Sequence, residues 1–341
     1  MKKCAFIIPY YGRLPQYFPI FLRSCGKNVD FDWLVFTDDH TAYDYPANVH
    51  VYYETFADMQ RRVSQSFPFH PELKTPYKLC DLKPMYGYLF AEYLAGYRFW
   101  GYCDCDIIFG NLSKFITEDM LSRYDKIFPL GHLSLMRNTE ENNRRFMLPL
   151  DGEPLYRKVL QSDNIFTFDE SYLPTNINRI YQEYGFPIDM EDCSGNVHMR
   201  SPEFVIRRYV NELGTFMTEA PMHAVYVWEY GSLKRYYVKF GKIEINELMY
   251  MHFQRRRMRM MADLTAYDRI KVLPGSFEPL EVESISVDNF NSIVWKREGD
   301  LMAHRRGLVR GDVLFWCKKI TNRIRSIIPW NILQKIGSNR S

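Results

Sequence analysis

The stretch that decides the fold is FWGYCDCDIIFGNL, residues 99–112, in which an apolar, aromatic run leads into Asp104 and Asp106. The run predicts a short buried strand over residues 99–103, and we expect the strand to break where the two acids begin. Two carboxylates this close supply hard oxygen ligands for a divalent cation and leave positions for phosphate oxygens and water. The competing interpretation is an exposed acidic strand end without a ligand.

The residues before this segment predict alternating strands and helices. Apolar runs predict buried strands over residues 4–9 and 32–37, and a third strand is expected over residues 49–53. Helices are expected over residues 17–28, 55–65 and 83–94. This alternation predicts an α/β fold with a mostly parallel sheet and helices on both faces.

The same pattern predicts where ligands bind. In mostly parallel sheets, ligands bind at the carboxyl ends of the strands. Residues 9–11, 37–39 and 104–106 each follow or end a predicted strand. We therefore expect these three segments to meet at one rim of the sheet.

The composition is that of a folded globular protein. With 46% hydrophobic and 25% charged residues among 341, the chain has enough apolar surface to offset the entropy lost on ordering. Its seven cysteines are scattered and odd in number, which predicts reduced, mostly buried thiols rather than a disulfide framework. No run approaches the roughly 18 apolar residues needed to span a bilayer. We therefore expect a cytoplasmic protein.

Positive charge is concentrated near the C-terminus. Residues 303–341 hold nine basic residues and one acid, so this segment carries +8 and the remaining chain −5. Over residues 312–328, apolar side chains recur at three- and four-residue spacing with basic residues on the other side, which predicts a basic amphipathic helix. This distribution argues against a nucleic-acid enzyme and favours docking on an anionic membrane surface. A terminal helix packed on the body is the competing interpretation.

Five segments in chain order carry a resemblance to a known family: IIPYYG (7–12), YKLCDLKP (77–84), GYCDCD (101–106), GH (131–132) and MHFQRR (251–256). With Asp-x-Asp on the fourth predicted strand, the sequence resembles metal-dependent, nucleotide-sugar glycosyltransferases of the GT-A fold. The details are most similar to bacterial glycosyltransferase-like proteins of surface-polysaccharide gene clusters. The resemblance implies a GT-A (Rossmann-like) domain over residues 1–260. A C-terminal extension with the basic amphipathic helix is expected over residues 261–341.

The resemblance also implies an activity. The chain would be a hexosyltransferase-type enzyme that moves a sugar from a nucleotide-sugar, a UDP-sugar, to a lipopolysaccharide- or capsule-type glycan or glycolipid. The charge distribution adds the expectation of a peripheral protein on the cytoplasmic face of the inner membrane, without a nucleic-acid partner. The sugar, the acceptor and the choice between retention and inversion stay open.

Two other classes of function compete with the transferase. A metal-dependent phosphohydrolase with an aspartyl nucleophile requires a threonine two residues after the second acid, where Ile108 stands. A catalytically silent, membrane-attached polysaccharide-assembly protein would keep the basic tail but need no metal.

The resemblance implies a metal shell in which His252, at the end of a late apolar strand, joins Asp104 and Asp106. An imidazole beside two carboxylates favours Mn²⁺ without excluding Mg²⁺. The competing role for His252 is to cap the strand or to hydrogen-bond a backbone carbonyl.

A second group of residues is implied to approach the donor sugar and its diphosphate. It comprises Asp104 together with Lys78, Asp81, Lys83, Arg255 and Arg256. Lys83 stands just before Pro84, where a helix N-terminus would face the rim and suit a phosphate. The two arginines would screen the leaving diphosphate. An ordinary charged first turn is the competing interpretation for the lysines and Asp81.

Residues at the ends of the first two strands suit a nucleotide base. Tyr10, Tyr11, Thr37 and Asp38 offer flat rings to stack on uracil and a carboxylate to hydrogen-bond it. Tyrosines of the buried core are the competing interpretation. His132 follows the apolar run 126–130 and would contact the donor or the acceptor sugar.

Asp169 and Glu170 are the best-placed acidic pair for a catalytic base that accepts the proton of an acceptor hydroxyl. An inverting enzyme needs such a carboxylate, whereas a retaining enzyme does not need one in that role. A solvated surface pair is the competing interpretation.

Overall fold

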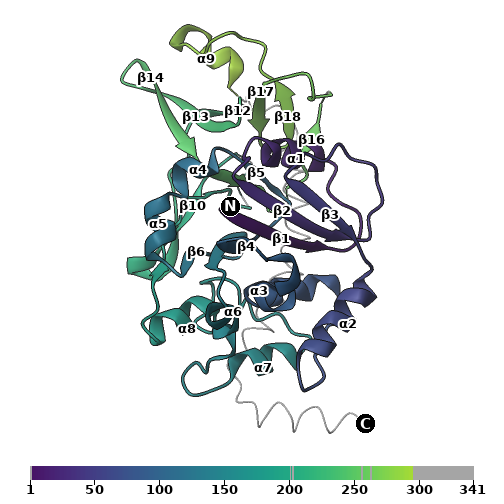
Figure 1. The fold of residues 1–341 in the computed structure, drawn as a ribbon. Coiled ribbons are helices and arrows are strands. Elements are labelled where there is room, and N and C mark those ends of the chain that lie inside the picture. The colour runs from purple at the N-terminus through teal and green to yellow at the C-terminus, as the bar shows by residue number, and fades with distance from the viewer. Residues whose placement is uncertain (1, 200, 202, 255, 262, 295–341) are drawn as a thin grey trace, which may run out of the picture.

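The computed structural model describes residues 2–294 except 200, 202, 255 and 262 (Figure 1). Its α-helices are α1 (Phe18–Gly26), α2 (Phe56–Ser66), α3 (Tyr86–Leu89), α4 (Leu112–Phe115), α5 (Glu118–Arg123), α6 (Glu140–Arg144), α7 (Leu155–Leu160), α8 (Ile177–Glu183) and α9 (Val287–Ile293). Its 3-10 helices are η1 (Pro76–Met85), η2 (Ala91–Tyr93), η3 (Arg145–Met147) and η4 (Asn211–Leu213). Within the described part, no helix combines the length and the apolar character that crossing a bilayer requires. The amphipathic helix expected over residues 312–328 lies outside the described residues.

A seven-stranded sheet forms the centre of the molecule, in the order β3-β2-β1-β4-β7-β6-β8. Its strands are β1 (Cys4–Tyr10), β2 (Phe31–Thr37), β3 (Val49–Tyr53), β4 (Phe99–Cys103), β6 (Lys126–Leu130), β7 (Leu133–Arg137) and β8 (Ile188–Asp189). The first four strands run parallel to one another, as the sequence predicts. β7 runs antiparallel to both β4 and β6, and β8 is parallel to β6.

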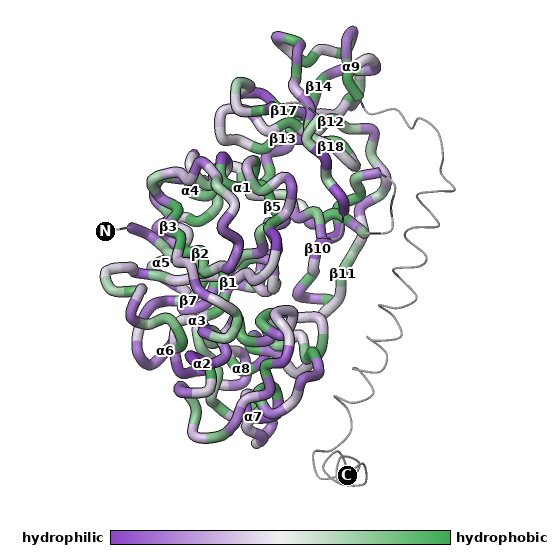
Figure 2. Tube along the Cα trace, turned by 90° about the vertical axis from the view of Figure 1, so that its right-hand side faces the viewer, coloured by the Kyte–Doolittle hydropathy of each residue, from purple (hydrophilic) through white to green (hydrophobic). Residues whose placement is uncertain are grey.

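Three further sheets make the fold a mixed α/β architecture, which corrects the expectation of one mostly parallel sheet. The three-stranded sheet is β5 (Ile107–Phe109), β15 (Tyr250–His252) and β9 (Gly195–Asn196). The six-stranded sheet is β14 (Lys242–Leu248), β13 (Ser232–Lys239), β12 (Ala224–Glu229), β17 (Arg269–Leu273), β18 (Ser276–Pro279) and β16 (Arg259–Met260). The two-stranded sheet is β10 (Arg207–Val210) and β11 (Thr215–Thr218), which Figure 2 shows along one side of the molecule.

The six-stranded sheet crosses the boundary expected at residue 260. Most of its pairings are antiparallel, and β17, which lies beyond that boundary, pairs with β12. The division into residues 1–260 and 261–341 stays a prediction.

Both faces of the central sheet are buried under helices, as the sequence predicts. Along β1, Ala5 and Ile7 belong to one core, whereas Cys4 and Phe6 belong to the other. Figure 1 shows α2, α3, α6, α7 and α8 below the sheet, and α1 and α4 above it. Because side chains alternate between the two faces of a strand, a strand buried on both faces reads as a continuous apolar run. This explains why the first strands could be recognised from sequence.

Two of the helix predictions had opposite outcomes. α2 begins as expected, because the Thr55 side chain accepts from the amide of Asp58 and the Asp58 carboxylate accepts from the amide of Thr55. The helix expected over residues 83–94 is wrong, since that stretch holds the end of η1, one turn of α3 and η2. Pro84 would be tolerated in the first turn of an α-helix, but here it lies inside η1, which already begins at Pro76.

A buried lysine supports an irregularity in β6. Lys126 is fully buried, and its Nζ donates to the Phe128 carbonyl and, at 2.8 Å, to Ser134 Oγ. The register between β6 and β7 shifts there, and Phe128 has a φ of +69°. Burial lowers the pKa of Lys126 to about 7, although Asp189 and Asp169 act in the opposite direction.

The free energy of unfolding should therefore rise with pH above 7, because folding lowers the pKa of Lys126. The pKa of Lys126 falls from 10.5 to about 7 on folding, so between those values the unfolded chain binds more protons than the folded one. Unfolding free energy then increases by about 2 kcal/mol from pH 7 to pH 9. Lys126→Met should lack this increment in urea titrations at the two pH values. Equal pH dependence in the two proteins would contradict a neutral buried amine.

Candidate active site

A cavity of about 690 Å³ brings most of the predicted site residues together. Those that line it are Tyr10, Tyr11, Lys83, Asp104, Asp106, His132, Asp169, Glu170 and His252. Thr37, Asp38, Lys78, Asp81 and Arg256 are absent from its lining. Arg255 lies outside the described residues.

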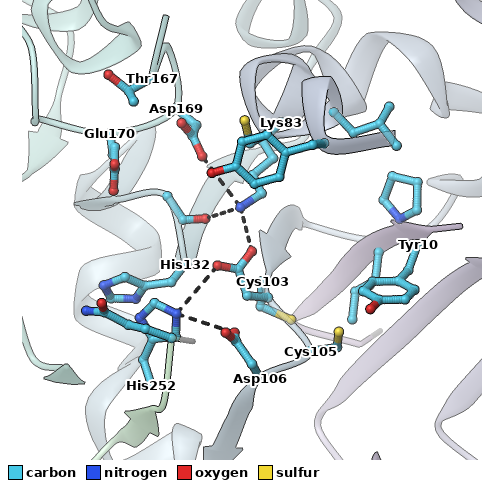
Figure 3. A pocket seen from close by; sticks show the side chains of 18 of the residues that line it. Tyr10, Lys83, Cys103, Cys105, Asp106, His132, Thr167, Asp169, Glu170 and His252 are labelled. Carbon is cyan, nitrogen blue, oxygen red and sulfur yellow. Dashed lines mark hydrogen bonds and ion pairs between the residues drawn. The ribbon is translucent and has the colours of Figure 1, made fainter. Parts of the chain in front are cut away.

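The break between β4 and β5 creates a cluster of three candidate metal ligands. Asp104 follows β4, Asp106 precedes β5, and His252 ends β15, which pairs with β5 so that His252 stands opposite Ile107. His252 Nε2 lies 3.3 Å from Asp106 Oδ1 and 3.7 Å from Asp104 Oδ2 (Figure 3). The three ligand atoms all lie within 4.8 Å of one another. The cluster therefore lies where the seven-stranded sheet, through β4, and the three-stranded sheet, through β5 and β15, meet.

The polar atoms of this cluster fit a divalent cation. Asp106 Oδ1 is buried and accepts no well-formed hydrogen bond from the described residues. A buried carboxylate oxygen without a donor is unfavourable unless a cation compensates it. Burial by itself lowers the pKa of His252, but Asp106 and Asp104 outweigh burial and raise the pKa in the metal-free protein. Two carboxylates and one imidazole form a ligand set suited to Mn²⁺ or Mg²⁺.

Asn196 orients the histidine of the cluster. Its Oδ1 lies 3.1 Å from His252 Nδ1 and accepts from Gln254 Nε2 at 2.6 Å. With the Nδ1 hydrogen donated to Asn196, the lone pair of Nε2 faces the carboxylates, as a metal-binding imidazole requires. The sequence gives no signal for Asn196, which lies in a two-residue strand.

Asn196→Leu should raise the Mn²⁺ concentration for half-saturation by about 10- to 100-fold, because the imidazole loses its acceptor. Asn196→Asp keeps that acceptor and serves as the control, with half-saturation at or below the wild-type value. Metal titrations followed by calorimetry measure both variants. If Asn196→Leu binds Mn²⁺ with wild-type affinity, Asn196 supports the fold and does not contribute to the metal site.

Lys83 connects the metal cluster to the candidate base. Its Nζ donates to Asp104 Oδ1 at 2.6 Å and to the Gly131 carbonyl at 2.8 Å, and it lies 3.5 Å from Asp169 Oδ2 (Figure 3). Burial opposes the charge, but Asp104 and Asp169 raise the pKa of Lys83 well above its usual range. The ammonium therefore stays charged between the two carboxylates.

Asp169 is held in a position that only a glycine neighbour allows. It is 4% exposed, and a Cβ on Gly131 would lie 2.3 Å from its Oδ2. Burial raises the pKa of Asp169 well above the usual range, while Lys83 acts against that shift. A carboxylate whose pKa is raised is a stronger base than one with the usual pKa.

Lys78 and Asp81 hold the loop that leads to Asp169. They form an ion pair of 2.8 Å in which their side chains are 2% and 0% exposed. Asp81 also accepts from the amides of Phe166 and Phe168 at 2.9 and 3.1 Å. The structure therefore gives them contacts within the protein rather than contacts in the cavity.

His132 presents an unused nitrogen. Its Nδ1 lies 2.7 Å from the Tyr250 hydroxyl, and its Nε2 is buried without a hydrogen-bond partner among the described residues. Burial lowers the pKa of His132 well below the usual range, and His252 and Lys83 add to the effect. The ring is therefore neutral and retains one nitrogen for a ligand.

The remaining predicted residues have other contacts. Asp38 accepts from the Gly12 amide at 2.6 Å, where Gly12 has a φ of +104°. Thr37 Oγ1 accepts from the Asp39 amide. The Arg256 guanidinium donates to the carbonyls of His198, Ser201, Glu203 and Pro274. Among the predicted base-binding residues, only Tyr10 and Tyr11 line the cavity, and the Tyr11 hydroxyl donates to Glu54.

Comparisons with known proteins give one firm assignment. The apo crystal structure of mouse xyloside xylosyltransferase 1 matches with 6% identity over 58% of this chain and 88% of that chain, at a TM-score of 0.33, which is too low to carry an argument. No curated protein sequence matches. A family model described as a family of unknown function, DUF6625, matches residues 6–281, so the chain belongs to that family.

Proposed function

We propose that this chain is a metal-dependent glycosyltransferase of the GT-A type, which moves a sugar from a UDP-sugar to a glycan or glycolipid acceptor. The observation that carries the proposal is the cluster of Asp104, Asp106 and His252 in an open cavity, beside Lys83 and the buried Asp169. The cavity lies at the carboxyl ends of β1 and β4, where α/β sheets bind ligands. Its volume of about 690 Å³ is within the usual range for a small-molecule site.

Different residues serve the leaving diphosphate and the attacking hydroxyl group. A divalent cation, when bound by the cluster, supplies positive charge for a leaving diphosphate. Lys83 keeps its charge next to Asp104 and adds to that compensation. His132 Nε2 is placed to hydrogen-bond a sugar or phosphate oxygen.

Asp169 is the better placed of the two predicted acids to act as the base. In an inverting reaction, the acceptor oxygen bonds to the anomeric carbon, the bond to the diphosphate breaks, and Asp169 takes the hydroxyl proton. Its burial and raised pKa suit this role. Glu170 also lines the cavity, on the same loop. A retaining reaction would leave Asp169 as an electrostatic group.

The membrane location and the surface-glycan acceptor rest on sequence alone. The basic segment 303–341 supports a peripheral protein on the cytoplasmic face of the membrane, and the resemblance supports a polysaccharide acceptor. The preference for Mn²⁺ rests on the imidazole of His252.

Calorimetric titration of UDP into the full chain tests the proposal. We expect binding with Mn²⁺, weaker or equal binding with Mg²⁺, and none in the presence of a chelator. Titration of inorganic phosphate under the same conditions is the matched comparison for a phosphohydrolase. Binding of phosphate without UDP binding, or no binding of either with metal present, would contradict the transferase.

A further inference from the structure

The hairpin of β13 and β14 ends in an exposed aromatic side chain that the fold does not explain. Phe240 is 93% exposed, and it forms the turn together with Gly241. Their φ values are +48° and +71°, so both residues adopt the left-handed conformation of a tight hairpin turn. Asn-Gly is favoured there, and a bulky residue at the first position is strained. Neither packing nor turn geometry therefore favours phenylalanine at this position.

Two lysines flank this ring. Lys239 and Lys242 stand directly opposite each other at the end of the hairpin, and Lys239 Nζ lies 5.6 Å from the centre of the Phe240 ring. Like charges in opposite positions destabilise a strand pair. Neither lysine forms an ion pair with another described residue, and the nearest acid along β14 is Glu244, which stands opposite Tyr237. The tip consequently combines an apolar ring with two lysines that form no ion pair with another described residue.

The shape of the hairpin favours a partner with a broad, deformable surface over a folded protein. Figure 1 shows β13 and β14 as an arm that projects at the upper left of the molecule. Val238, next to the tip, is 41% exposed. A stable protein partner would need roughly 800 Å² of this chain's surface, far more than one ring at a turn offers. A second copy would bring four lysines together.

We propose that the β13–β14 tip docks on an anionic lipid bilayer, with Phe240 in the headgroup region and Lys239 and Lys242 on lipid phosphates. A bilayer accepts a single side chain without a preformed pocket, and each lysine near an anionic surface strengthens binding about fivefold. This contact is distinct from the one expected of residues 312–328 and does not depend on the proposed catalysis.

Co-sedimentation of the full chain with vesicles tests the affinity. We expect Phe240→Ser to weaken binding to phosphatidylglycerol/phosphatidylcholine vesicles about tenfold, and Lys239→Gln with Lys242→Gln to weaken it about 25-fold. Tyr230→Ser is the matched control, because Tyr230 is 69% exposed in an equivalent turn with a φ of +51° at the other end of β13. It should bind as the wild type does. Pure phosphatidylcholine vesicles should bind all of these proteins weakly.

Tryptophan placed at the tip tests directly whether position 240 enters the bilayer. Phe240→Trp should gain bromolipid quenching on anionic vesicles relative to the wild type, whereas Tyr230→Trp should not. An unquenched tryptophan at position 240 on vesicle-bound protein would overturn the proposal. Wild-type vesicle affinity of Phe240→Ser would also overturn it. So would light scattering that shows a dimer for the wild type and a monomer for Phe240→Ser.

Discussion

Asp106→Asn should abolish metal-dependent UDP binding and lower sugar transfer by about 10³-fold or more, while the chain stays folded. The substitution preserves the volume of the side chain and removes its charge. Asp106 Oδ1 is the buried oxygen without a well-formed hydrogen bond, and it lies 3.3 Å from His252 Nε2. The loss of this charge therefore removes one of the three candidate metal ligands.

Calorimetry with Mn²⁺ and UDP measures the binding loss, and circular dichroism confirms the fold. Asp189→Asn is the matched control, because Asp189 Oδ2 is also buried without a hydrogen-bond partner among described residues but Asp189 is absent from the cavity lining. This control should bind Mn²⁺ and UDP as the wild type does. Normal turnover of Asp106→Asn with Mn²⁺ would refute the metal site.

Asp81→Leu should lower the free energy of unfolding by about 3–5 kcal/mol, because it leaves the Lys78 charge buried without its partner. The Lys78 ammonium would keep the Asn164 carbonyl as its acceptor, and the amides of Phe166 and Phe168 would lose theirs. Urea denaturation at pH 7 measures the change. Adding Lys78→Met should recover much of the loss, since an apolar pair of similar volume needs no compensation.

An exposed ion pair supplies the matched control. Lys74 and Glu72 lie 3.0 Å apart with side chains that are 64% and 35% exposed, so Glu72→Gln should change stability by less than about 1 kcal/mol. The measurement also separates two roles of Asp81. If Asp81→Leu weakens UDP binding with unchanged stability, Asp81 contacts the donor rather than the loop before Asp169.

The central strands could be predicted from sequence because they are local features. Residues 49–53 and 99–103 form strands with the predicted limits, and the second is an apolar run that ends at Asp104. β9 and β16 could not be predicted, because two residues carry no periodicity and their pairing depends on distant partners. Pro84 was expected to start a helix, but it lies inside a 3-10 helix.

In the candidate site, too, local features could be predicted from the sequence and contacts between distant segments could not. Asp104 and Asp106 could be found because an apolar strand ends in two acids, and the structure brings His252 to them. The resemblance implied that Lys78 and Asp81 approach the donor, whereas the structure pairs them with each other inside the protein. Asp81 accepts from the amides of Phe166 and Phe168, about 85 residues further along the chain. A contact at that separation cannot be predicted from the local sequence.

The close approach of Asp169 to Gly131 has a consequence for the evolution of this family. A methyl group at position 131 would overlap the carboxylate, since its carbon would lie 2.3 Å from Oδ2. Glycine at this position and aspartate at position 169 should therefore be inherited as a unit. Lineages that exchange the glycine for a larger residue should therefore also have displaced or lost the acid.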